Sequence, residues 1–271
     1  MAIPKVSKDD IHKWSDFNIL ASHVNNSGVL VDRRFQNVVK FGYNKDIDSN
    51  AEETIWAQGG QWQPTTGAET VSIVSSSTND TNGGTGANLL AIFGLDADYI
   101  AVSELTIALS GTTPVTSSLS YRYINRLAVA FSGSGLKNEG TITVTQSTSG
   151  VVLATIPPDE SITQQAVYTI PAGYTGYLQG IYVNGGKTSG GSVPLIEYEV
   201  YSYNNLSNTR YRVSTAVEDA SSGNSLTFEF PFANPTAEKN TLYVNASTNT
   251  NNTQVFCRFF MRLIANGADF T

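Results

Sequence analysis

The arrangement most open to a catalytic interpretation is a pair of glutamates two residues apart. Glu197 and Glu199 lie in a run with the composition of a β-strand, so their side chains would share one face. Glycosidases use two such carboxylates as acid and nucleophile or base. Arg210 and Arg212, also two apart, occupy the next predicted strand, and a hairpin in matching register would make cross-strand ion pairs of all four. The sequence favours ion pairing, with a glycan-degrading enzyme as an alternative.

Nucleophiles and bases of other kinds are few. The only two histidines, His12 and His23, both precede the β-rich part of the chain. A Ser-His-Asp triad or a histidine-rich metal site would have to recruit this N-terminal segment. The single cysteine, Cys257, stands in an apolar strand pattern, where a free cysteine packs as a small hydrophobic side chain. We therefore predict no catalytic residue and no enzymatic activity.

Two pairs of aspartates offer the oxygen ligands that calcium prefers. Asp46 with Asp48, and Asp96 with Asp98, each lie two residues apart, but neither pair has the spacing of an EF-hand loop. Aspartate is also common in turns, where it hydrogen-bonds to nearby backbone. We predict no bound metal and no cofactor, and we keep calcium at these turns as an alternative.

Tyrosines are numerous, with 13 in the chain, and tyrosine faces can stack on sugar rings. One candidate glycan platform consists of Tyr174, Tyr177 and Tyr182. A second consists of Tyr198, Tyr201 and Tyr203. Tyrosine equally serves hydrophobic cores and subunit interfaces, where one end of the ring is dry and the other wet. The sequence favours that structural use, and a glycan-binding surface remains the alternative.

The composition excludes several classes of protein. Only 14% of the 271 residues are charged, and polarity is carried by 28 Ser, 29 Thr and 23 Asn, which disfavour helix interiors. No stretch approaches the roughly 20 apolar residues of a membrane span. A net charge of −7 argues against nucleic acid as a partner. The N-terminal residues lack the apolar core of a signal peptide.

Charge is distributed unevenly along the chain. Residues 1–45 hold seven cationic and four acidic side chains, a net +3, whereas the remainder holds 9 and 19, a net −10. This asymmetry predicts a basic arm that docks on an acidic neighbouring surface, with ordinary scatter along a solvated segment as the alternative. The contact residues expected in the arm are Lys5, Lys8, Lys13, Trp14, Arg33, Arg34 and Lys40.

Periodicity predicts one helix followed by many strands. Apolar residues at 11, 14, 17 and 20 predict a short helix over 9–20. Short strands are expected at 28–31 and 36–41 in the lead-in. From residue 52 onward, runs rich in β-branched and aromatic residues alternate with Gly/Ser/Asn/Asp turns. The predicted strands are 71–75, 88–93, 99–109, 121–131, 141–145, 151–156, 166–170, 174–183, 194–203, 209–217, 226–230, 241–245 and 254–264, with 88–109 forming a hairpin.

The last predicted strand has two different faces. Val255, Cys257, Phe259, Met261 and Leu263 would share one apolar face. The opposite face mixes aromatic residues with Arg258 and Arg262, and such a face is expected to be partly buried against another subunit.

Strands without intervening helices predict an all-β fold, an antiparallel β-sandwich or jelly roll preceded by an extended N-terminal arm. The expected division is an arm over 1–50 and sandwich units over 51–147 and 148–271. One larger sandwich over 51–271 is the alternative, and the sequence leaves both open.

Several phrases resemble a group of virion structural proteins of tailed bacteriophages, especially phages of marine and cyanobacterial hosts. They are NVVKFGYNKDID at 37–48, ETIW at 53–56, GG at 59–60, GLD at 94–96 and VYTIPAGYTGYL at 167–178. The resemblance runs from about residue 37 to 180, and none of these phrases is a catalytic motif.

The resemblance implies a non-enzymatic part of the virion, and we expect a capsid decoration or cement protein. Its expected partners are the major capsid protein and other copies of this chain, in a homotrimer by analogy with other viral jelly rolls. Its expected location is the phage head surface, after synthesis in the cytoplasm of the bacterial host. A tail, baseplate or fibre component and a host-glycan-binding module are the alternatives.

Overall fold

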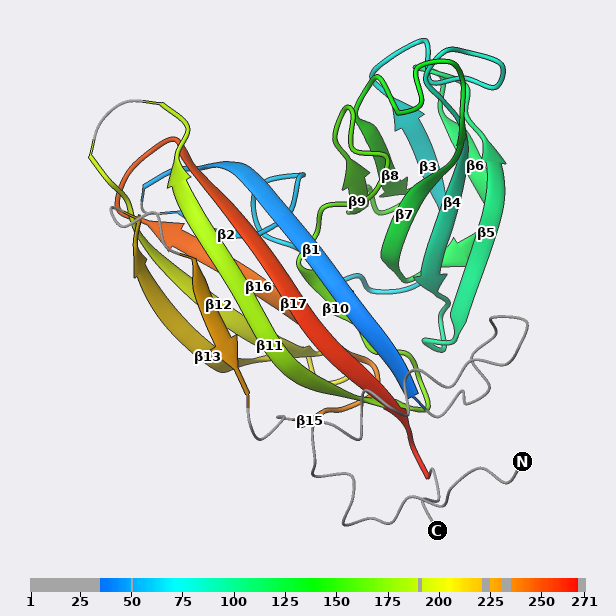
Figure 1. Cartoon of the computed structure of the whole chain (residues 1–271). Helices are drawn as coiled ribbons and strands as arrows, with labels where there is room; N and C mark the ends of the chain where they lie inside the picture. Colours follow the sequence, from blue (N-terminus) through cyan, green and yellow to red (C-terminus); the bar gives the residue numbers. More distant parts are fainter. Residues whose placement is uncertain (1–34, 50, 190–191, 221–224, 231–234, 268–271) are drawn as a thin grey trace, which may run out of the picture.

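The computed structural model describes residues 35–49, 51–189, 192–220, 225–230 and 235–267. These residues form strands joined by turns and loops, and no element among them is an α-helix (Figure 1). All pairings between the strands are antiparallel, and they build four separate sheets. The prediction of an all-β antiparallel fold is therefore confirmed.

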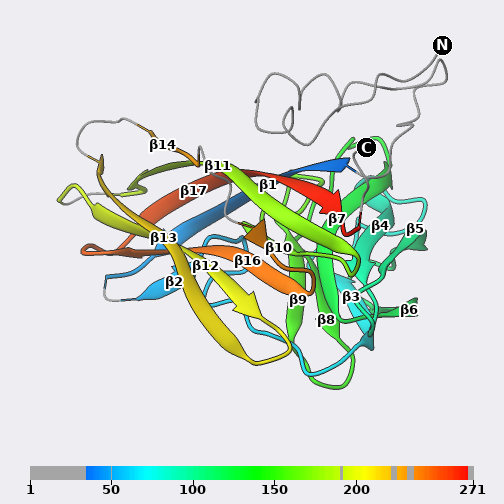
Figure 2. The same ribbon diagram turned by 90° about the horizontal axis from the view of Figure 1, so that it is seen from below.

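Two of the sheets face each other and form the larger pair (Figure 2). Sheet 1 has the order β1 (Phe35–Ile47), β17 (Thr253–Ala265), β11 (Tyr174–Lys187) and β14 (Leu226–Glu229), with β15 (Pro235–Thr236) also on β11. Sheet 2 has the order β10 (Val167–Thr169), β16 (Asn240–Thr248), β12 (Leu195–Asn204) and β13 (Thr209–Asp219), with β2 (Glu52–Thr54) on β16. Both sheets contribute to one hydrophobic core, represented by Leu178, Val183, Val200, Val244 and Phe259.

The other two sheets form the smaller pair. Sheet 3 has the order β6 (Val115–Tyr121), β3 (Glu69–Ser75), β8 (Ile142–Gln146) and β9 (Val152–Ile156). Sheet 4 has the order β5 (Ala101–Ala108), β4 (Ala87–Leu95) and β7 (Tyr123–Ser132). They enclose a second core, represented by Ile73, Leu90, Leu127, Val144 and Ile156. Each pair thus buries the apolar faces of its own alternating strands.

Strand alternation explains several elements directly. In β17 the five residues predicted to share an apolar face are all buried, whereas Arg258 and Phe260 between them are exposed. β4 and β5 form the predicted hairpin, and Asp96 closes its turn by accepting backbone N–H bonds from Asp98 and Ile100, both 2.9 Å. Three strands, β2, β6 and β15, were not predicted, because they are short or poor in β-branched apolar residues.

The sheets do not follow the expected linear division of the chain. β1 falls within the expected arm of residues 1–50, yet it pairs along its length with β17 and belongs to sheet 1. The expected boundary at 147/148 falls in the turn of the β8–β9 hairpin, where the Gln146 N–H donates to the Val151 carbonyl over 2.9 Å. The smaller pair is instead inserted between β2 and β10 of the larger pair (Figure 1).

Aromatic side chains fill the junction between the two pairs. Trp62 lies at its centre, with ring centroids 5.8 Å from Tyr123 and 5.2 Å from Tyr243. The Tyr123 hydroxyl donates to the Asn205 side-chain oxygen over 2.6 Å, which links β7 to the loop after β12. The Arg122 guanidinium lies 4.8 Å from the ring centre of Tyr99. The pairs are therefore packed directly against each other.

Candidate functional site

Most of the predicted arm contacts lie outside the described residues. This applies to Lys5, Lys8, Lys13, Trp14, Arg33 and Arg34, and also to the predicted helix at 9–20, the strand at 28–31 and both histidines. Lys40 is described, and it is buried at the junction rather than exposed on an arm. Its ammonium donates to the backbone carbonyl of Asn125 on β7.

The outward side of sheet 1 carries a contiguous set of aromatic side chains, which we call the aromatic face. Opposite residues on paired strands share a face, so the pairing of Phe41 and Tyr182 with Arg258 places these three in one row. Phe256 packs edge-on against Phe41 at 4.6 Å and against Tyr182 at 5.9 Å. The members of the aromatic face are Val39, Phe41, Tyr43, Tyr182, Phe256, Arg258 and Phe260.

Exposure along this face is uneven. Phe260 is 39% exposed and Val39 is 45% exposed, which is unusual for apolar residues in the middle of long strands. Arg258 is exposed in the same surface, and its contact with another subunit stays a prediction. Arg262, predicted to play the same part, is only 4% exposed, and its Nε donates to the Asn37 side-chain oxygen over 3.1 Å. Burial lowers the Arg262 pKa to about 10.

The predicted tyrosine platform is divided between two faces. A bulge between Leu178 and Gly180 shifts the alternation of β11 by one residue. Tyr177 and Tyr182 therefore both point outward, although they are five positions apart and regular alternation would put them on opposite faces. Tyr174 instead packs against the hydrophobic core of the larger pair, and its hydroxyl accepts a bond from the Gln36 amide at 3.0 Å.

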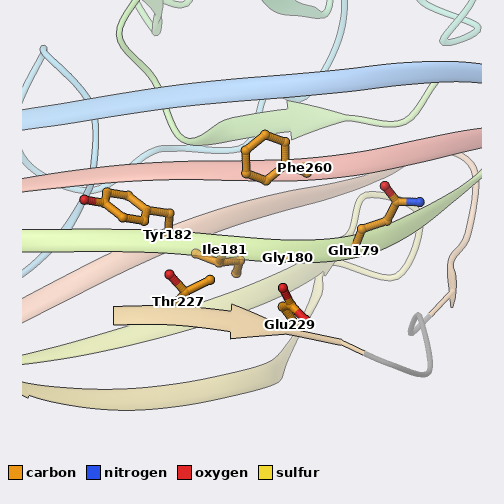
Figure 3. Close-up of a pocket in the computed structure, with 7 residues that line it drawn as sticks. All are labelled: Gln179, Gly180, Ile181, Tyr182, Thr227, Glu229 and Phe260. Atoms are coloured by element: carbon orange, nitrogen blue, oxygen red, sulfur yellow. The ribbon is translucent and has the colours of Figure 1, made fainter. Parts of the chain in front are cut away.

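A groove of about 370 Å³ opens where this bulge interrupts the aromatic face (Figure 3). Gly180 forms its floor, because it stands opposite both Phe260 and Glu229 and has no side chain to fill the space. Phe260 and Tyr182 supply aromatic walls, and Gln179, Thr227 and Glu229 supply polar groups at the rim. In such a groove the aromatic walls can stack on a flat or ring-shaped ligand, and the polar rim can hydrogen-bond to the hydroxyls of the ligand.

A second depression of about 400 Å³ lies on the other side of Tyr182. It is lined by Tyr43, Asn184, Gln254 and Phe256, and the Tyr43 hydroxyl donates to the Gln254 side-chain oxygen over 2.9 Å. Tyr182 is thus the shared wall of two depressions. Tyr182 was predicted from the sequence, whereas its partners from β1 and β14 were not. An isolated glycine inside a strand is nevertheless a signal for a bulge.

The paired glutamates have structural partners. Glu199 is buried and forms an ion pair with Arg212, as predicted. Glu197 instead accepts a bond from the Thr215 hydroxyl at 3.2 Å. Arg210 pairs with Glu52 of β2 at 3.3 Å, and lies 4.2 Å above the Tyr201 ring. The expected cross-strand ion pairing of these four side chains is therefore only partly formed, between Glu199 and Arg212.

Neither predicted aspartate pair is part of a larger cluster. Among the residues with a described position, no group of three or more His, Cys, Asp or Glu side chains is placed to hold a metal ion. Cys257 lies in the hydrophobic core of the larger pair, and burial raises the pKa of its thiol. The absence of enzymatic activity, metal and cofactor remains a prediction. No helix in the described ranges is long and apolar enough to cross a membrane.

Comparison with known proteins places the chain in no family. No family model matches it, and no curated protein matches it. Among solved structures, it aligns with one described as the structure of infectious bursal disease virus Gt strain. The alignment has a TM-score of 0.24 and 10% sequence identity, and it covers 88% of this chain and 74% of that one. A likeness at this level supports no conclusion about fold or function.

Proposed function

We propose that the chain is a non-enzymatic structural protein of a tailed-phage virion, a decoration or cement protein of the head that assembles with copies of itself. The aromatic face is the observation that supports this proposal. Interfaces are enriched in aromatic residues and arginine and depleted in lysine and glutamate, and the aromatic face has this composition around Arg258. A large exposed aromatic surface on a sheet also marks an interaction site.

The proposed occupant of the aromatic face is a second copy of the chain, in a homotrimer. In a three-fold ring each interface is formed by two different surfaces, so the aromatic face would meet another part of the neighbouring copy. Arg258 is suited to that contact, because residues 46–271 carry a net charge of −10. The finer fold description, two units of β-sandwich or jelly-roll type, belongs to the same proposal and is supported by one core between each two facing sheets.

Replacing Phe260 with serine is expected to dissociate the oligomer, because this side chain would lose its apolar contacts at the interface. Light scattering coupled to size-exclusion chromatography of the full chain should give a trimer for the wild type and a folded monomer for Phe260→Ser. The apparent thermal midpoint of the variant should be lower, because dissociation removes the stabilisation that association adds. Phe131→Ser is the matched control, since Phe131 is 61% exposed on the smaller pair. A wild type that stays monomeric at all concentrations contradicts the proposed trimer.

Six of the seven arm residues expected to make contacts lie in residues 1–34, and they support a contact with the major capsid protein. Because β1 belongs to sheet 1, a truncation that tests this contact must end before Phe35. Removal of residues 1–34 is expected to abolish cosedimentation with phage heads while the remaining chain keeps its oligomeric state. Cryo-electron microscopy of the parent particle would locate the protein. Retained binding of the truncated chain to heads contradicts the role of the segment.

A second candidate function is binding of host glycans, and the groove of Figure 3 is the observation that favours it. Aromatic walls stack on the apolar faces of sugar rings, and the side chains of Gln179, Thr227 and Glu229 provide both donors and acceptors for hydroxyls. Gly180 leaves room for the ring to approach the strand. This function is compatible with a tail, baseplate or fibre location.

Tyr182→Ala is expected to remove glycan binding, because Tyr182 lines both depressions. A glycan array probed with the full chain should show specific signals that fall at least tenfold in the variant, the loss of about 1.4 kcal/mol of contact. Tyr211→Ala is the control, since Tyr211 is 55% exposed on β13 of the other sheet. An array without signals for the wild type contradicts this function and leaves the structural role standing.

A further inference from the structure

A groove separates β1 from the smaller pair and differs in character from the aromatic face. Its volume is about 420 Å³, and it is lined by residues 36–40 of β1, 93–95 of β4, 101–103 of β5, Asn125 and Arg126 of β7, and Tyr168 and Pro171. Five consecutive residues of a strand span about 16 Å. The groove is therefore long enough for several residues of an extended peptide.

The charges in the groove are unbalanced. Lys40 and Arg126 are both cationic, and none of the described residues that line the groove carries a carboxylate. Lys40 is only 6% exposed, and within the described parts of the chain it forms no ion pair. Burial, with a smaller contribution from the positive charge of Arg126, lowers the Lys40 pKa to about 7. A buried ammonium without a counter-charge is costly, and a bound anion would offset that cost.

The walls beside these cations are apolar. Val39 is 45% exposed and Phe93 is 39% exposed, and both line the groove. Phe93 projects from β4 at a position opposite Arg126 of β7, so an apolar wall and a cation are neighbours across one strand pair. A small inorganic anion would bind the two cations but would leave the apolar walls exposed to water. A peptide with an acidic residue beside an apolar one would use both.

We propose that this groove binds an extended acidic peptide segment of a partner protein, with a carboxylate at Lys40 and Arg126 and the adjacent apolar side chain against Val39 and Phe93. The ammonium and guanidinium would form charge-assisted hydrogen bonds with the carboxylate. The proposal does not depend on the virion role. It shares only Val39 with the aromatic face, because β1 is the edge strand of sheet 1 beside the groove.

The test uses the full chain and a pooled library of capped hexapeptides in which Glu alternates with Val, Leu, Ile or Phe. A second library with Gln in place of Glu is the control for charge. We expect the wild type to enrich the Glu library only. For an enriched peptide, Lys40→Met and Arg126→Gln should each weaken binding about tenfold, as expected for loss of a charge-assisted hydrogen bond.

Lys45→Gln is the matched control, because Lys45 is exposed on the same strand outside the groove. Enrichment that ignores the charge of the peptide, or that survives both groove variants, overturns the proposal. So does a library without any enriched sequence. Inorganic phosphate is tested in parallel, and binding of phosphate alone would show an anion site without a peptide site, which also overturns it. Arg126→Gln keeps the test decisive if Lys40→Met does not fold.

The pH dependence of binding separates a direct role of Lys40 from a structural one. The other ionisable groups that line the groove are Arg126 and Tyr168, and burial raises the pKa of Tyr168 further above neutrality. Lys40 is thus the group whose charge changes near pH 7. Peptide affinity should fall as the pH rises from 6 to 9 in the wild type and in Arg126→Gln, but not in Lys40→Met. A flat profile in the wild type contradicts the assignment.

Discussion

Replacing Asp80 with alanine is expected to lower the free energy of unfolding of the smaller pair by about 4 kcal/mol. Asp80 is fully buried. Its Oδ1 accepts the backbone N–H groups of Ala87 and Glu139, each at 2.8 Å. Its Oδ2 accepts the N–H of Gly140 at 2.8 Å and the hydroxyl of Ser75 at 2.6 Å. One carboxylate thus joins three segments of the smaller pair.

The size of this effect follows from the donors that the substitution leaves behind. Alanine would deprive three backbone N–H groups of their partner, and each unsatisfied buried donor costs about 1–3 kcal/mol. Urea denaturation, monitored by amide hydrogen exchange of residues in the smaller pair, measures the change in the free energy of unfolding. Asp96→Ala is the control, because Asp96 also accepts two backbone N–H bonds but in an exposed turn. Equal losses in the two variants would contradict the argument.

Gly42→Ala is expected to destabilise the larger pair by about 3 kcal/mol. A Cβ on Gly42 would lie 2.2 Å from the Ile55 carbonyl oxygen and 2.4 Å from the Ala166 nitrogen. Both are backbone atoms, so no side-chain rotation can relieve the clash. They are also bonded to each other, since the Ala166 N–H donates to the Ile55 carbonyl over 2.9 Å. β1 can approach these segments only because residue 42 lacks a side chain.

The thermal midpoint and the denaturant midpoint of the full chain both report this loss. Gly186→Ala is the matched control, because Gly186 lies in β11 of the same sheet and a Cβ there meets nothing within 4 Å. Its substitution should change the free energy of unfolding by no more than about 0.5 kcal/mol. If both alanine variants unfold alike, the close approach of β1 does not limit stability.

The local pattern of apolar and polar residues predicted much of the fold. The alternation of β17 and the hairpin of β4 and β5 followed from residues adjacent in the sequence, because burial of one strand face imposes a period of two. The partner of each strand could not be predicted in this way. Nothing in residues 36–41 indicates pairing with the last strand, since Asn37 and Arg262 meet although 225 positions separate them. The local pattern of this segment therefore predicts an arm.

The candidate site was predictable only in part for the same reason. Tyr182 and Arg258 could be identified by residue type, but the groove between Phe260 and Glu229 depends on a bulge that reverses the faces of β11. The bulge placed Tyr182 on the face of Tyr177, whereas ordinary alternation put Tyr174 on the opposite face. The Glu199–Arg212 ion pair could be predicted, because its two strands form a hairpin. The partner of Arg210 could not, because Glu52 lies in β2, a strand of three residues that is distant in the sequence.

The pairing of β1 with β17 also determines when the molecule can be completed. All strands of sheets 3 and 4 are available once residue 156 has been synthesised, so the smaller pair can fold while the rest of the chain is still on the ribosome. β1 must wait for the last strand of the chain before sheet 1 can close, and closing so long a loop is slow. During synthesis β1 is therefore an unpaired strand, and the early-folding insertion beside it is the first structure it can contact.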